Sequence, residues 1–425
     1  MKALEYKKLN ETLYIEKLDN GLEVYMLEKN AFNKTFALFA TAYGSVNSEF
    51  VPIGKKEFEK VPDGIAHFLE HKLFDQENGE DVFEKFSEQG ASANAYTSYS
   101  RTAYLFSCTE RTEENLSLLL DYVQAPYFTE ESVEKEKGII EQELKMYLDM
   151  PGEVLMLGVL ENLYHNNPVK IDIGGTVESV YEINKDMLDL CYNTFYHPSN
   201  MKLVIVGKFD KDEIIELIKN NQAQKEFPKL DKVIKAEVEE PNDVALKSSE
   251  IDFNVTTPMT AIAIKAKDPY IDNTEKIKRQ ISLSILFDGL FAKSSDNYLK
   301  LVKAGIINDS FSYSYMEEPS FGFALISCDT NKYKDFIESI KDILLTSKIT
   351  EETFMRIKKL KIGEYMNQFD SIDYIGRQLV NHLTNEYIML DFLEEINNLT
   401  KADFDAIVEE FVTENCMSDC TVLKK

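Results

Sequence analysis

The chain has 425 residues, of which 44% are hydrophobic and 28% charged, and its formal net charge at pH 7 is −27. This length exceeds what one ordinary hydrophobic core organises, so we expect two domains in a globular protein. The negative charge argues against nucleic acid and anionic membrane surfaces as partners, because their phosphates would repel the chain.

The N-terminal residues show no uninterrupted apolar segment, and nothing resembles a transmembrane span, so we expect neither a secretory signal nor a membrane anchor. The five cysteines are scattered and odd in number. Such cysteines are typical of reduced thiols, and we therefore expect a cytoplasmic location.

The first half of the chain combines strand-like and helical patterns. Runs rich in β-branched and aromatic residues predict strands at 22–27, 35–43, 92–97, 102–108 and 201–206. Apolar residues at helical spacing predict helices at 113–123, 130–148, 153–164 and 185–195, in addition to a helix around residue 67.

The pattern fails between residues 225 and 250, where two prolines and dense charge indicate a linker. Beyond it the order recurs, with strands, a long helix at 274–290, two more strands, several helices and a closing strand. We therefore expect domains at 1–226 and 251–425 with a linker at 227–250. The predicted fold class is α+β, with two similar domains, each an antiparallel-rich sheet backed by helices, joined into a clamshell.

Two of the five histidines lie in the stretch GIAHFLEHKLF, residues 64–74. On a helix His67 and His71 project from one face, where two imidazoles can supply half of a tetrahedral zinc site. Glu70 lies beside that point and could take a proton from a water molecule. The second half's long helix, QISLSILFDGLF, has no counterpart of these residues, so we expect one zinc ion per chain.

A catalytic zinc site needs a third protein ligand, and the helix ESVEKEKGIIEQELKMYL is the best source. Glu143 lies in an otherwise apolar stripe of this helix, where an acid is costly unless it is paired or metal-bound. Glu136, two turns earlier on the same stripe, could accept a hydrogen bond from a ligating histidine. Spacing alone leaves the third ligand open, because helices carry many acids.

The chain resembles the pitrilysin/insulinase family of inverted-motif zinc peptidases, particularly its half-length bacterial members, which are similar to mitochondrial processing peptidase. The blocks GIAHFLEHKLF, NAYTSYSRTAYLF, EKEKGIIEQE and FYHPSNMKLVIVGKFD carry the resemblance. It implies that His67, His71 and Glu143 ligate zinc and that Glu70 is the general base. The family's distal E-x6-E pattern corresponds to Glu136 and Glu143.

The stretch SANAYTSYSRTAYLF predicts an edge strand onto which an extended peptide could add. The resemblance places Asn94 and Ala95 near the scissile bond, although an ordinary half-buried strand would show the same residue pattern. One departure concerns an arginine and a tyrosine seven residues apart, which polarise the substrate carbonyl in active members. Lys300 and Ile307 stand there instead, and no spacing supports Tyr313, Tyr315, Arg356 or Arg377 as substitutes.

These features predict a zinc-dependent endopeptidase, and the resemblance implies that it hydrolyses unfolded peptides in an enclosed chamber. Two alternatives stay open. One is a zinc-binding but catalytically incomplete peptide-binding subunit of a hetero-oligomeric processing protease, and the other is a structural zinc protein. A homodimer or a heterodimer with a related subunit is the expected assembly, and in the first case the related subunit would supply the arginine–tyrosine pair.

Overall fold

The computed structural model describes residues 1–77, 79–230, 232–268 and 272–425. The chain divides into two compact units. The first unit contains residues 1–144, 172–236 and 366–390, and the second contains 145–171, 237–365 and 391–425. Each unit thus takes segments from both expected domain ranges, and the domain boundaries at 1–226 and 251–425 stay a prediction.

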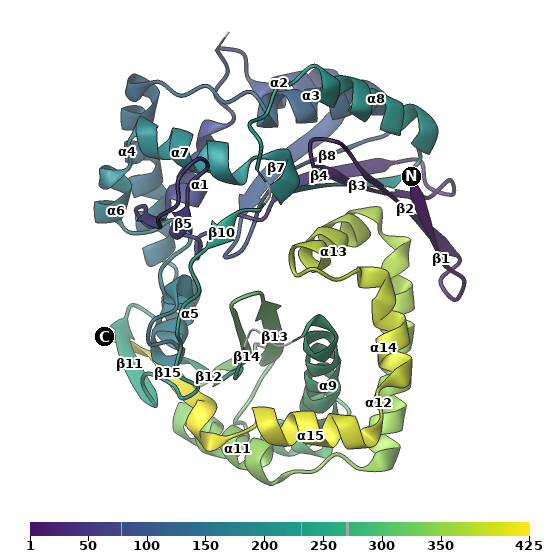
Figure 1. Ribbon diagram of the computed structural model, residues 1–425. Helices are drawn as coiled ribbons and strands as arrows, with labels where there is room; N and C mark the ends of the chain where they lie inside the picture. The colour runs from purple at the N-terminus through teal and green to yellow at the C-terminus, as the bar shows by residue number, and fades with distance from the viewer. Residues whose placement is uncertain (78, 231, 269–271) are drawn as a thin grey trace. The chain divides into compact units, whose positions relative to one another are not determined.

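The first unit is built on a sheet of seven strands in the described residues, in the order β1-β2-β3-β9-β4-β8-β7 (Figure 1). Only β3 and β9 pair in parallel, and the other neighbours are antiparallel. The strands are β1 (Lys2–Tyr6), β2 (Glu11–Lys17), β3 (Glu23–Glu28), β4 (Thr35–Thr41), β7 (Ala91–Thr97), β8 (Thr102–Cys108) and β9 (Met201–Gly207). A small second sheet consists of β5 (Glu49–Val51), β6 (Glu59–Lys60) and β10 (Ile234–Lys235).

The second unit has a sheet of five described strands in the order β11-β15-β12-β14-β13. Here β11 and β15 are the parallel pair, and the remaining neighbours are antiparallel. The strands are β11 (Ser248–Phe253), β12 (Met259–Lys265), β13 (Ser312–Glu318), β14 (Phe321–Asp329) and β15 (Met417–Lys424).

The two sheets share one topology, which confirms the α+β fold of two similar halves. Numbered along the chain within each half, the strands from β3 and from β11 onward lie in the same order, first-fifth-second-fourth-third. In both cases the first and fifth strands are parallel. The repeat of order predicted from the sequence is therefore a repeat of sheet topology, with β7 and β13 as equivalent edge strands.

Helices of the first unit lie on both faces of its sheet. One face buries a large core against β3, β4, β8 and β9, to which α1, α3, α4, α7 and α8 contribute. On the other face α13 packs against β4 and β9. The helices of this unit are α1 (Ile65–Lys72), α2 (Val82–Glu88), α3 (Thr112–Val123), most of α4 (Glu130–Leu148), α6 (Val177–Glu182), α7 (Lys185–Phe195), α8 (Lys211–Ala223) and α13 (Ile372–Thr384).

The second unit buries its sheet against α5 and α9. Helix α5 packs on β11, β12 and β15, and α9 packs on β13. Its helices are α5 (Pro151–Leu163), α9 (Asn273–Phe291), α10 (Asp296–Lys303), α11 (Tyr333–Thr346), most of α12 (Glu351–Asn367), α14 (Phe392–Asn398) and α15 (Lys401–Phe411). No helix in the described parts of either unit combines the length and apolar character that crossing a bilayer requires.

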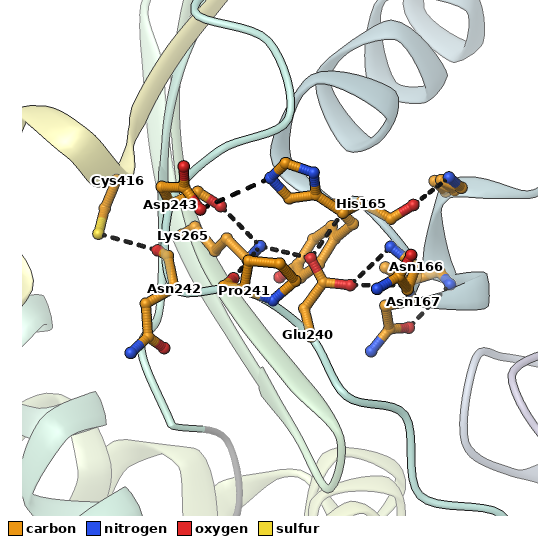
Figure 2. Close-up of polar contacts among 12 residues, drawn as sticks. His165, Asn166, Asn167, Glu240, Pro241, Asn242, Asp243, Lys265 and Cys416 are labelled. Atoms are coloured by element: carbon orange, nitrogen blue, oxygen red, sulfur yellow. Dashed lines mark hydrogen bonds and ion pairs between the residues drawn. The ribbon is translucent and has the colours of Figure 1, made fainter.

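The irregular segment expected as a linker is anchored within the second unit by Glu240 (Figure 2). Its carboxylate accepts backbone N–H bonds from His165, Asn166 and Asn167, each at 2.8 Å. It also accepts a bond of 2.6 Å from Lys265, whose side chain is 2% exposed. Four donors on one carboxylate make this contact a fixed attachment of residues around 240 to the segment that follows α5.

Candidate metal centre

Helix α1 follows Gly64, whose φ of 88° lies in the left-handed region that favours glycine. A Cβ at this position would lie 2.2 Å from the carbonyl oxygen of Gly174. The chain around Gly174 and Gly175 therefore packs backbone to backbone against the start of α1. This contact fixes where the helix that carries the two motif histidines begins.

The apolar side of α1 is held in the core of the first unit. Ile65, Phe68 and Leu69 are buried, and so is the Lys72 side chain. His67 and His71 share one helix face as expected, and their ring centroids lie 4.5 Å apart.

Helix α4 brings Glu143 to the two imidazoles. The helix buries Val133, Ile140 and Leu144. Glu143 then lies with one carboxylate oxygen 3.8 Å from Nε2 of His67 and the other 3.5 Å from Nε2 of His71. One ligand atom from each of the three residues lies within 4.8 Å of the others, the one such histidine, cysteine and acid cluster found among the described residues.

Glu136 orients His71 through the ring nitrogen that does not face Glu143. Its Oε1 lies 3.0 Å from Nδ1 of His71, so a proton on Nδ1 leaves the Nε2 lone pair facing Glu143. Burial alone would lower the pKa of His71, but the hydrogen bond and charge of Glu136 outweigh burial and raise it. Burial raises the pKa of Glu136, and the bond to His71 and the charge of Lys72 bring it below its usual value.

Lys72 was not predicted from the sequence as part of this site. Its side chain is 1% exposed, and its Nζ forms an ion pair with Asp75 and lies 3.8 Å from Glu136. The ammonium group therefore supports the carboxylate that holds His71. A lysine directly after a motif histidine carries no sequence signal of such a role.

Glu70 is 9% exposed and lies on α1 beside the imidazoles. The Thr97 hydroxyl donates a 2.6 Å hydrogen bond to its carboxylate. Burial raises the pKa of Glu70 even though the Thr97 bond opposes the shift. Thr97 in turn lies 3.4 Å from the hydroxyl of Thr102, which donates to the backbone oxygen of Tyr43.

The donor set fits zinc. Ligand atoms about 2.0–2.1 Å from a tetrahedral ion lie roughly 3.3 Å from one another, close to the imidazole–carboxylate separations of 3.5 and 3.8 Å. Burial, and then the neighbouring His71, lower the pKa of His67 to about 4, so its imidazole is neutral and able to ligate at pH 7. His67 and His71 present nitrogen donors and Glu143 an oxygen donor, the ligand chemistry of a three-residue catalytic zinc site.

Asn94 and Ala95 lie on β7, the last strand of the seven-stranded sheet. The Asn94 side-chain oxygen accepts the backbone N–H of Ala95 at 2.9 Å. Thr97, which contacts Glu70, belongs to the same strand. The structure thus connects the edge strand to the motif helix through one hydrogen bond, which sequence reasoning missed because neither residue type nor spacing indicates it.

The second unit offers no guanidinium–phenol pair at the expected positions. Lys300 is exposed on α10, and Ile307 is buried. The hydroxyl of Tyr313 donates to Asp288, and that of Tyr315 to Glu317. Both candidate tyrosines are therefore already engaged within the unit.

Comparison with known proteins places the chain in a family. Residues 50–177 match the family described as insulinase, peptidase family M16, and residues 182–361 match the peptidase M16 inactive domain. The chain is 45% identical over 427 residues to the uncharacterized zinc protease YmfH of Bacillus subtilis (strain 168), with 100% of both chains covered. The chain therefore belongs to the insulinase family, peptidase family M16, which confirms the resemblance expected from its sequence blocks.

Two further relatives show the same similarity. An M16-like peptidase from Alicyclobacillus acidocaldarius has a crystal structure that matches with a TM-score of 0.94 at 36% identity, covering 100% of both chains. The chain is also 28% identical over 172 residues to mitochondrial-processing peptidase subunit beta of Caenorhabditis elegans, covering 40% of this chain and 38% of that one.

Proposed function

We propose that this chain is a zinc-dependent endopeptidase that cleaves unfolded peptides, with one zinc ion held by His67, His71 and Glu143. The observation that carries the proposal is the convergence of two imidazoles and one carboxylate beside a second, buried carboxylate, that of Glu70. A structural zinc site has no use for the second carboxylate, because it needs no base.

The bound ion would acidify water and polarise the scissile carbonyl. Glu70 takes a proton from water and returns it to the leaving amine. Glu136 holds His71 in the tautomer that presents Nε2. Asn94 and Ala95 bind the substrate at the open edge of β7, Ala95 through its backbone, as a peptide that adds one more strand to the sheet.

Metal content and peptide cleavage test the assignment together. The Glu70→Gln variant should keep about one zinc per chain and lose cleavage of an unstructured peptide by roughly 10²–10⁴-fold. The Glu143→Gln variant should lose both. The control is Glu141→Gln on the same helix, which alters an acid that accepts a hydrogen bond from Tyr181. Zinc loss in the control but not in Glu143→Gln would reject the ligand set.

A second candidate is favoured by the residues at 300 and 307. An exposed lysine and a buried isoleucine supply neither of the two carbonyl-polarising groups. The chain would then be a zinc-binding, peptide-binding subunit that needs a related partner, in keeping with a relative named as a subunit. Retained zinc without cleavage, followed by cleavage on addition of a related chain that carries the arginine–tyrosine pair, would support this candidate.

We place this activity in a reducing compartment such as the cytoplasm. All five cysteines are free and buried. Free thiols in this number are typical of proteins that work where glutathione keeps cysteines reduced.

A further inference from the structure

Arg377, on α13 of the first unit, forms no ion pair with any acid in the described part of the chain. Its guanidinium lies over the ring of Phe36 at 5.8 Å and over the ring of Tyr96 at 5.6 Å from the ring centroids. Within the described residues these ring contacts are its only recorded interactions. A guanidinium that stacks on rings keeps five N–H donors in its own plane for another molecule.

An arginine with no ion pair to a described acid is unusual in a chain with 74 acidic and 47 basic residues. The acid one helical turn earlier, Asp373, pairs with Lys34 at 3.0 Å. Arg377 is only partly exposed, so solvation of its charge is incomplete. These features together indicate a binding site for an anionic group or a strong hydrogen-bond acceptor.

Tyr96, one of the two rings beneath Arg377, belongs to the edge strand β7. The backbone N–H of Ser98 donates to the carbonyl of Arg101, which marks these residues as a hydrogen-bonded pair. In an antiparallel ladder every second residue of a strand hydrogen-bonds the same neighbouring strand through its backbone. Counting back from Ser98, the backbones of Tyr96 and Asn94 therefore bond to β8. The backbone groups of Ala95 and Thr97 therefore point to the edge where an added peptide strand would pair, and the Asn94 side chain that accepts the Ala95 N–H would have to give way to it.

Side chains along β7 alternate between the two faces of the sheet. Ala91, Ala93 and Ala95 pack against the core that contains α1, and Thr97 bonds Glu70 on that face. Tyr96 points to the opposite face, where Arg377 lies. A substrate residue paired opposite Tyr96 would put its side chain on the Arg377 face, because directly opposed residues share a face.

We propose that Arg377 is a specificity residue that selects an acidic side chain in the peptide bound along β7. The inference rests on the proposed peptidase function and adds a substrate class to it. Because Arg377 and Glu70 lie on opposite faces of β7, the guanidinium does not replace the carbonyl-polarising arginine that the chain lacks. It binds a side chain of the peptide, one that points away from the metal centre.

Peptide binding to the zinc-loaded Glu70→Gln variant tests the inference without turnover. The probes are unstructured, fluorescently labelled decapeptides in which a single glutamate replaces glutamine at each position in turn. Glutamate should strengthen binding by about tenfold at one position, or at positions two apart, as expected for an ion pair to a partly buried arginine. The preference should weaken between 50 and 500 mM salt.

Changes at Arg377 identify the residue responsible. Added to Glu70→Gln, Arg377→Gln should remove the glutamate preference, Arg377→Lys should keep a weaker one, and Arg377→Glu should reverse it in favour of lysine. The matched control is Arg356→Gln, which removes one exposed positive charge in the second unit and should change nothing. Thermal unfolding of each variant verifies that the first unit is intact, and the reversal by Arg377→Glu is a gain that a misfolded variant cannot produce.

Failures of the two proposals are distinguishable. A wild-type chain that cleaves peptides with no preference for glutamate, or whose preference survives in Arg377→Gln, overturns the role of Arg377 and leaves the peptidase assignment standing. A chain that neither binds nor cleaves any peptide overturns both.

Discussion

At the scale of single residues, the sequence predicts the motif histidines and Glu70 but not their neighbour Thr97. The spacing of His67, Glu70 and His71 predicts one helix face, and the structure places the two imidazoles there with Glu143. Thr97 lies 27 residues from Glu70 in the sequence, and its 2.6 Å bond to that carboxylate exists only because β7 runs past α1. Local periodicity carries no information on such a contact.

Thr97 should act as a positioning residue for Glu70. Replacing it with valine keeps the shape of the side chain and removes the hydroxyl. We expect kcat to fall by about tenfold or more, because a hydrogen bond to a charged group contributes about 1.5–3 kcal/mol. KM and zinc content should stay close to wild type, since the hydrogen bonds of Thr97 go to none of the three proposed metal ligands.

The serine variant is the control for this prediction. Thr97→Ser retains the hydroxyl and should recover most of the wild-type kcat. Steady-state kinetics and metal analysis of both variants decide the matter. Equal losses of kcat in the valine and serine variants, or loss of zinc in either, would contradict the prediction. Thr97 would then act through side-chain packing and not by orienting the Glu70 carboxylate.

At the scale of elements, strand patterns predict the five strands of each half that the shared topology contains, but not their order in the sheet. Strands such as β4 and β8 bury nearly every residue, and their apolar runs were recognisable. Strands β1 and β2 escaped prediction because they extend the sheet at its margin and carry charged or partly exposed side chains. Helix α9 occupies the place in the repeat that α1 holds in the first half, but only α1 carries ligand residues.

The segment around Glu240 has the irregular backbone predicted for a linker, but a distant contact fixes it. Glu240 and Lys265 are both nearly inaccessible, with side chains 7% and 2% exposed. Removing one partner of a buried ion pair typically costs about 3–5 kcal/mol, because the other charge is left unpaired. Glu240→Gln should therefore loosen the contact drawn in Figure 2.

Hydrogen exchange at His165, Asn166 and Asn167 reports on this contact directly, since their amides donate to Glu240. Exchange there should accelerate by at least about tenfold in Glu240→Gln, in line with a loss of 1.4 kcal/mol or more. The matched control is Glu239→Gln, an exposed neighbour. Equal exchange in the two variants would mean that Glu240 does not hold the segment.

At the scale of the whole molecule, the division into units depends on segments that local patterns could not assign. Helix α13 follows residue 366 in the sequence but belongs to the first unit, where it buries Ile375, Leu379 and Val380. Gly376 lets it approach the sheet closely, since a Cβ there would meet the Phe36 ring at 2.4 Å. Helix α5 precedes residue 172 but belongs to the second unit, against β11, β12 and β15.

Separate expression of residues 1–226 and 251–425 should therefore give two incomplete folds. The first fragment lacks α13 and the second lacks α5, and each missing helix buries several side chains worth about 1.5–3 kcal/mol apiece. Such losses approach the 5–15 kcal/mol that stabilises a typical domain. We expect both fragments to bind a hydrophobic dye and to melt without a sharp transition, and a mixture of 1–226 with a peptide of residues 366–390 to regain cooperative melting. A fragment 1–226 that melts as sharply as the intact chain would instead establish the continuous domain that sequence reasoning predicts.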